Sequence, residues 1–137
     1  IGIHSIKDAV GDFEFSKKQL ELLKDKADIY SGNDNQTYDF VINGGVGVVS
    51  VASHVVGDEI SEMISFAKDN DLEKAEEINM QLSNLFESIF EEPSPGPIKK
   101  ILSESWEEVG EPLLPITTIT PELANKIRGF YKKIKEN

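Results

Sequence analysis

The sequence predicts an α/β fold, the last part of a (β/α) barrel followed by a helical region. Two observations lead to this prediction: short β-type runs alternate with helical patterns at the start of the chain, and everything from residue 57 onward reads as helix. The β-type runs are "IGIHSIKDA" (1–9), "ADIYSG" (27–32) and "VGVVSVAS" (46–53). Because each strand and its helix occupy only about 20 residues, a parallel sheet or a (β/α) barrel is expected.

The elements between the runs carry helical signals. Asp12 is placed to cap a first helix, in which apolar residues recur near helical spacing. The third run is apolar on both faces, as in a strand that is covered from both sides. Its glycines at 44, 45 and 47 resemble a phosphate loop, but they precede a strand, so turn geometry is the better interpretation.

The second half of the chain is expected to be helical with two interruptions. One apolar stripe runs from Ile60 to Ala67 and a longer one from Leu72 to Ile89. "EEPSPGPIKK" then breaks the pattern, since its prolines cannot continue a helix. A final helix is expected after Thr120, its cap, with Pro121 as the first helical residue.

These elements form an unbalanced set. Three parallel strands leave a sheet with open edges, and the chain begins without methionine, so we expect the carboxy-terminal part of a larger barrel. The expected division is a partial barrel over residues 1–69 and a helical region over 70–137. A small complete domain with three strands is the alternative.

Composition excludes several function classes. The 137 residues carry a formal net charge of −11, which disfavours nucleic-acid partners because these require a basic surface. No segment approaches the about 20 apolar residues of a membrane span, so no membrane partner is expected. The absence of cysteine excludes disulfides and thiolate metal sites and fits a cytoplasmic protein. His4 and His54 are too few and too far apart for a metal site, and none is expected.

Lys7 is the candidate catalytic residue. Side chains alternate along a strand, so Lys7 shares a face with Ile1 and Ile3, which is not an obvious solvent face. A lysine there either lies at the open end of a strand in solvent or has a chemical role. In a (β/α) barrel the carboxyl ends of the strands form the active-site mouth, which suits an inward-facing lysine near a strand end.

Four ordered motifs carry a resemblance to a known family. They are "IKDAVGD", "YSGNDNQ", "GGVGVVSV" and "EEPSPGPIK". In this order and at these separations the chain resembles the second half of the dihydrodipicolinate synthase and N-acetylneuraminate lyase superfamily, over essentially its whole length. The resemblance implies strands six to eight of a (β/α)8 TIM barrel followed by a C-terminal helical region.

The resemblance also implies an activity and its residues. Lys7 matches the lysine that forms a Schiff base with pyruvate, in a class I aldolase or lyase that condenses pyruvate with a small aldehyde, aspartate semialdehyde, in lysine biosynthesis. Val49 matches a residue whose main-chain carbonyl contacts pyruvate, although it also reads as a core strand residue. Gly32 and Asp34 match a loop near the aldehyde, and a helix cap or turn carboxylate is the competing interpretation of Asp34. No cofactor is implied, because the lysine imine is the electron sink, and a homotetramer is expected.

Several positions depart from the family pattern. Ser5 stands in place of glycine, Val10 in place of Thr or Ser, and His54 in place of asparagine. Ser94 and Gly96 also alter the proline segment, and "PLLP" (112–115) lacks an arginine. These differences leave open a sibling lyase that acts on 2-keto-3-deoxy sugar acids or N-acetylneuraminate. A non-catalytic half-barrel scaffold is the third alternative. The G-x-x-G-E loop and the relay tyrosines of the family have no match here, so the chain by itself is expected to be inactive.

Overall fold

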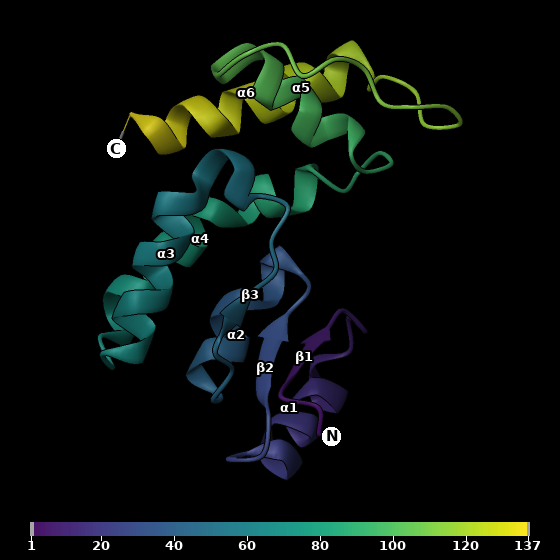
Figure 1. Cartoon of the computed structure of the whole chain (residues 1–137). Helices are drawn as coiled ribbons and strands as arrows, with labels where there is room; N and C mark the ends of the chain where they lie inside the picture. The colour runs from purple at the N-terminus through teal and green to yellow at the C-terminus, as the bar shows by residue number, and fades with distance from the viewer. Residues whose placement is uncertain (1, 137) are drawn as a thin grey trace. The chain divides into compact units, whose positions relative to one another are not determined.

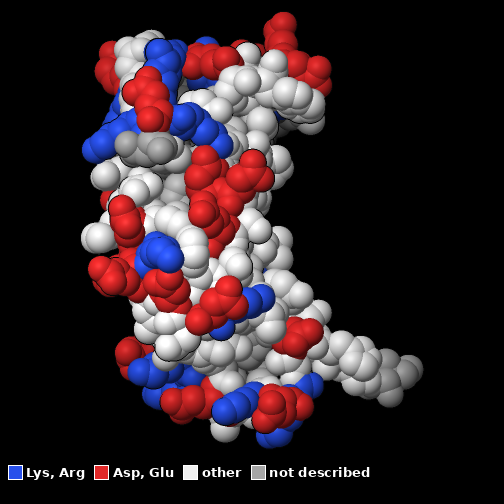
Figure 2. Space-filling model, turned by 90° about the vertical axis from the view of Figure 1, so that its left-hand side faces the viewer, with Lys and Arg blue, Asp and Glu red and all other residues white. Residues whose placement is uncertain are grey.

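The computed structural model describes residues 2–136, and it divides the chain into two compact units. The first unit comprises the residues up to Val51 together with Asp58–Asn79, and the second comprises Ala52–Gly57 together with the residues from Met80 onward. Each unit is described by itself. In residues 2–136 no helix combines the length and the apolar character that a membrane crossing demands. Figure 2 shows Asp and Glu side chains dispersed among Lys and Arg over the face in view.

The first unit contains a parallel sheet of three strands in the order β1–β2–β3 (Figure 1). The strands are β1 (Ser5–Asp8), β2 (Asp28–Ser31) and β3 (Gly47–Val48). The three predicted strands are therefore present and parallel. The extent predicted for the third, 46–53, is wrong: β3 has two residues, because the chain turns away after Val49 and enters a helix at Ser53.

Two helices of this unit pack against one face of the sheet. They are α1 (Phe13–Leu23) and α2 (Thr37–Ile42), the latter preceded by the 3₁₀ turn η1 (Asp34–Gln36). Asp12 caps α1 as predicted, since its carboxylate accepts hydrogen bonds from the backbone N–H groups of Glu14 and Phe15. Leu20 of α1, Ile29 of β2 and Phe40 of α2 form a buried cluster that joins the two helices to the sheet.

The long helices are α3 (Ser53–Lys68) and α4 (Leu72–Ser88). Helix α3 begins four residues before the predicted 57, with a kink at Val56 (φ −130°, ψ 38°). Within the first unit Ala67 of α3 and Ala75 of α4 are buried against Val41 of α2. The apolar stripes that the sequence analysis identified thus form contacts between helices.

The second unit contains α5 (Gly96–Ser105) and α6 (Pro121–Lys135). The predicted start of the last helix is confirmed, since the Thr120 hydroxyl accepts a hydrogen bond from the Leu123 N–H and Pro121 is the first helical residue. The Arg128 guanidinium of α6 donates two hydrogen bonds to the Glu104 carboxylate of α5, at 2.7 Å from Nε and 2.6 Å from Nη2. This pair joins the two helices at the surface.

Candidate active site

Lys7 lies at the carboxyl end of β1, on the face of the sheet opposite the helices. Along β1 the side chains alternate: Ser5 and Lys7 are exposed, whereas Asp8 is buried and Ile6 is half-buried. Strand register places Lys7 beside Tyr30 of β2. Within residues 2–136 no carboxylate lies within ion-pairing distance of the Lys7 ammonium. The side chain therefore stands on an open face and is not neutralised by an acidic neighbour.

Gly32 lies directly against the Lys7 side chain. A Cβ atom at position 32 would come within 2.8 Å of Lys7 Cε and 2.6 Å of Ala9 Cβ, distances at which a real Cβ atom would clash. The Gly32 N–H also donates a hydrogen bond to the Asp8 carbonyl at 2.6 Å, which extends the β1–β2 pairing past the strand ends. Glycine is thus required here by space, because Ala9 Cβ and the Asp8 carbonyl oxygen, 2.9 Å away, are held by the backbone and cannot make room for a Cβ atom, and Lys7 Cε fills the remaining space.

Val49 follows β3 at the same edge of the sheet. Its N–H donates a hydrogen bond to the Ser31 carbonyl at 2.8 Å, so the backbone continues along β2 for one residue beyond the strand. The residue is 49% exposed, which shows that Val49 is not a buried core residue in this chain.

Asp34 is buried, with 2% of its surface exposed, and its carboxylate binds the segment that follows Val49. One oxygen accepts a hydrogen bond from the Ser50 hydroxyl and the other accepts one from the Val51 N–H at 3.1 Å. The structure therefore joins the four predicted residues in two pairs: Lys7 with Gly32, and Val49 with Asp34 through the residues after Val49.

Asp8, which was not among the predicted site residues, is a buried acidic residue that follows Lys7 directly in β1. It is 4% exposed, and its carboxylate accepts hydrogen bonds from the Ser16 hydroxyl at 2.7 Å and from the Val10 N–H at 2.9 Å. Ser16 lies in α1, so Asp8 ties the end of the lysine strand to the following helix. The sequence could have indicated this role, because Asp8 lies on the face of the strand opposite Lys7, and an acidic side chain buried there needs a hydrogen-bond partner.

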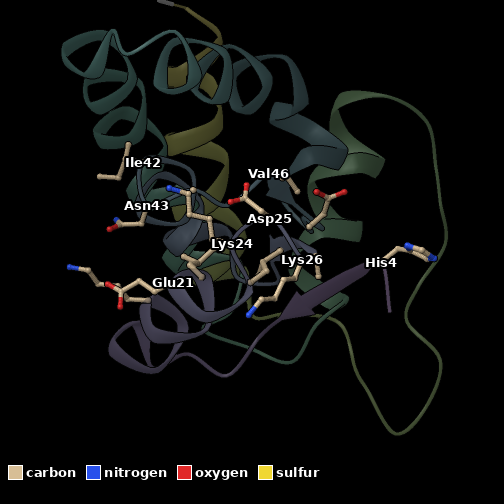
Figure 3. Close-up of a pocket in the computed structure, with 14 residues that line it drawn as sticks. His4, Glu21, Lys24, Asp25, Lys26, Ile42, Asn43 and Val46 are labelled. Atoms are coloured by element: carbon tan, nitrogen blue, oxygen red, sulfur yellow. The ribbon is translucent and has the colours of Figure 1, made fainter. Parts of the chain in front are cut away.

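A cavity of about 790 Å³ lies at the other end of the strands (Figure 3). His4, Asp28 and Val46 line it, and these residues precede or begin the three strands. None of the four predicted site residues contributes to its lining. In (β/α) barrels the chemistry occurs at the carboxyl ends of the strands, so the candidate site is the edge that carries Lys7.

Of the two tyrosines in the first unit, Tyr30 lies beside Lys7 and Tyr38 does not. Tyr30 shares the open face with Lys7, while Tyr38 lies on α2. Burial raises the pKa of the Tyr38 phenol, and the negative charges of Glu76 and Asp39 raise it further. Among residues 2–136 no cluster of three His, Asp or Glu side chains could hold a metal ion.

Comparison with known proteins gives one consistent result. The sequence model described as the dihydrodipicolinate synthetase family matches residues 2–134. The chain is 32% identical over 134 residues to a 4-hydroxy-tetrahydrodipicolinate synthase of Listeria monocytogenes, covering 98% of this chain and 46% of that protein. It is 39% identical over 127 residues to the enzyme of the same name from Thermosynechococcus vestitus, covering 93% of this chain and 43% of that protein.

Solved structures agree with these sequence relatives. The fold is similar to the 4-hydroxy-tetrahydrodipicolinate synthase of Methylacidiphilum fumariolicum, with a TM-score of 0.91 and 29% identity over 98% of this chain and 45% of that chain. It is also similar to a dihydrodipicolinate synthase of Cyanidioschyzon merolae solved with lysine bound, with a TM-score of 0.90 and 34% identity over 97% of this chain and 45% of that chain. These similarities confirm the predicted partial (β/α)8 barrel with a C-terminal helical region, and the chain spans about half the length of the relatives that it matches. The chain belongs to the dihydrodipicolinate synthetase family.

Proposed function

We propose that this chain carries the nucleophile of a class I, pyruvate-dependent aldolase, 4-hydroxy-tetrahydrodipicolinate synthase. The observation that carries the proposal is the position of Lys7, at the carboxyl end of a barrel strand, on the open face and against a glycine that leaves room for its side chain. Membership of the family and the names of the relatives support the same activity.

The proposed chemistry needs a free amine and a 2-oxo acid. The deprotonated Lys7 amine attacks the carbonyl carbon of pyruvate, and loss of water gives an iminium ion. The iminium withdraws electrons, so the neighbouring methyl group loses a proton and an enamine forms. The enamine carbon attacks the aldehyde carbon of aspartate semialdehyde, and hydrolysis of the new imine returns Lys7. The imine is itself the electron sink, so this sequence of steps needs no cofactor.

The remaining site residues have supporting roles in the proposal. The Val49 carbonyl contacts bound pyruvate, and Gly32 and Asp34 form the loop near the aldehyde. Family likeness further leads us to expect a homotetramer that works in lysine biosynthesis, in the cytoplasm. Sedimentation of the full-length gene product that contains this chain tests the tetramer.

The decisive experiment is reduction of the imine in the full-length gene product. Borohydride added with pyruvate should fix a covalent adduct, which mass spectrometry should locate at Lys7. The Lys7→Arg variant keeps the positive charge but should form no adduct. An adduct at another lysine, or none in the unaltered protein, would reject the mechanism.

A sibling lyase for 2-keto-3-deoxy sugar acids or N-acetylneuraminate is the second candidate. It is favoured by Ser5 and Val10, which depart from the family pattern and are both exposed close to Lys7 in the sequence. Turnover assays with aspartate semialdehyde and with sugar-derived aldehydes distinguish the two, because both enzymes should form the same pyruvate adduct. Adduct formation without turnover of any aldehyde would instead favour a scaffold that retains the lysine.

A further inference from the structure

We infer that Asp34 is a positioning residue: it fixes the peptide that carries the Val49 carbonyl and does not itself contact the aldehyde. The inference rests on the proposed function, since it concerns the contact between Val49 and pyruvate. It changes the role of Asp34 from a binding group for the second substrate to a support for binding of the first.

The burial of Asp34 argues against direct contact with a substrate. Asp34 is 2% exposed, and a carboxylate removed from water needs hydrogen-bond donors to compensate for the lost hydration. Its two oxygens receive different donors, the Ser50 hydroxyl at Oδ1 and the Val51 N–H at Oδ2. A group that is covered and engaged in this way is poorly placed to bind a substrate.

The hydrogen-bond donors to Asp34 come from a distant segment of the chain. Ser50 and Val51 are 16 and 17 positions further along the chain, so Asp34 is not a local turn carboxylate. Asp34 is also the first residue of η1 rather than its N-cap, which is Asn33. The carboxylate therefore links the loop after β2 to the segment after β3, across the carboxyl edge of the sheet.

The peptide between Val49 and Ser50 is held from both sides as a result. On one side the Val49 N–H is bonded to the Ser31 carbonyl of β2. On the other side the Ser50 hydroxyl and the Val51 N–H are bonded to Asp34. The direction of the Val49 carbonyl is set by this peptide plane, because the peptide unit is planar and rigid. Loosening the Asp34 side should let the carbonyl turn away from pyruvate.

The test compares Asp34→Ala, Asp34→Asn and Ser50→Ala in the full-length gene product, with Asp28→Asn as control. Asp28 is an exposed acid at the opposite end of β2. Half-saturating pyruvate is measured by borohydride trapping without any aldehyde, and the KM of the aldehyde is measured separately. We expect about a tenfold rise in half-saturating pyruvate for Asp34→Ala, on the scale of a lost hydrogen bond to a charged group. Smaller rises are expected for Asp34→Asn and Ser50→Ala, while the aldehyde KM and the control change less than about twofold.

The Asp34→Asn variant distinguishes a positioning role from a role that depends on the negative charge of Asp34. Its amide oxygen can still accept from the Val51 N–H, and the Ser50 hydroxyl can turn to accept from the amide nitrogen, so part of the support survives. A residue that acts on substrate through its charge should lose as much in Asp34→Asn as in Asp34→Ala. Hydrogen exchange at the Val51 amide should be faster in Asp34→Ala, which reports the loosened segment without any substrate.

The outcomes separate this inference from the proposed function. If the unaltered protein forms no adduct at Lys7, the proposed function fails and the positioning role fails with it. If the adduct forms normally and the Asp34 variants change only the aldehyde KM, the positioning role alone is overturned. The same holds if Ser50→Ala leaves half-saturating pyruvate unchanged. Should Asp34→Ala not fold, Ser50→Ala still decides, because it removes a single hydroxyl from a half-buried residue.

Discussion

Two residues, on opposite faces of the sheet, fix the surroundings of Lys7: Gly32 lies beside its side chain, and Asp8 points to the buried face. Gly32 leaves space for the aliphatic stem of Lys7, while Asp8 anchors the backbone from the opposite, buried face of the strand. Because alternate residues of a strand point to opposite faces, one residue can present its amine while the next is tied to the helix layer. The position of the proposed nucleophile thus depends on two neighbours that need not touch the substrate.

Gly32→Ala should impair both the placement of Lys7 and the stability of the fold. The added Cβ would meet Lys7 Cε at 2.8 Å and the Asp8 carbonyl at 2.9 Å, and the backbone atom cannot yield as easily as the side chain. We expect slower imine trapping by the full-length gene product and a loss of about 1–3 kcal/mol in unfolding free energy, as in overpacked sites. Gly129→Ala is the control, because nothing lies within 4 Å of its Cβ position and it should stabilise α6 slightly. An unchanged trapping rate in Gly32→Ala would contradict the close packing.

Ser16→Ala tests the anchor on the buried face. Ser16 is fully buried, and its hydroxyl lies 2.7 Å from Asp8 Oδ2, so its removal leaves a buried carboxylate oxygen short of a donor. The unfolding free energy should fall by about 1–3 kcal/mol, measured by urea denaturation. Ser83→Ala serves as control, since that hydroxyl only donates to a carbonyl one turn away in α4. Equal losses in the two variants would show that the Asp8 contact has no special weight.

At the scale of elements, the sequence predicted those features that depend on residues close together in the chain, such as helix caps. Asp12 and Thr120 cap their helices through hydrogen bonds that span two or three residues, and such spacings can be read directly from a sequence. The parallel sheet followed from the alternation of apolar runs and helical patterns.

Features set by distant contacts could not be predicted in this way. The end of β3 depends on the segment around Ser50, which bonds to Asp34 16 positions away, so an apolar run of eight residues yields a strand of two. The same contact gives Asp34 its surroundings, which a motif match places only near a loop. Lys7, by contrast, was predicted as the nucleophile because four motifs resemble those of the family, not because its own neighbours mark it.

The ion pair between Glu104 of α5 and Arg128 of α6 makes the stability of the second unit depend on pH. Hydrogen bonds from Arg128, followed by those from Lys100, lower the pKa of the Glu104 carboxyl below its ordinary value of 4.5. A lowered carboxyl pKa adds stability that is present above about pH 4.5 and is lost as the pH falls through the lowered value. Glu104→Gln should therefore cost about 0.5 kcal/mol at pH 7, the scale of a partly exposed ion pair, and progressively less in acid.

Urea denaturation of the full-length gene product at pH 7 and at decreasing pH measures this difference. Glu108→Gln is the matched control, because Glu108 is an exposed acid of the same unit and Arg128 bonds to Glu104 instead. A stability gap for Glu104→Gln that stays constant down to pH 3 would show that the pair does not act through ionisation of Glu104.

At the scale of the whole molecule, the relatives are about twice as long as this chain. In residues 2–136 the face that carries Lys7 is open, and apolar side chains along the same part of the chain are exposed, Ile3 at 75% and Val10 at 63%. An imine reaction benefits from a site that excludes water and holds the carboxylate of the 2-oxo acid. In the proposed enzyme, this chain would supply the amine and one edge of such a site.

The purified chain of residues 1–137 should therefore show no aldolase turnover by itself. With water at the amine, imine formation competes with hydrolysis, and no G-x-x-G-E loop or relay tyrosine of the family is present in this sequence to bind pyruvate and transfer protons. A coupled assay with pyruvate and aspartate semialdehyde should find activity only in the full-length gene product, while prolonged trapping should still label Lys7 weakly in the isolated chain. Circular dichroism establishes that the isolated chain is folded when it is assayed. Turnover by the folded 137-residue chain at the rate of the full-length product would show that the open face is sufficient for catalysis.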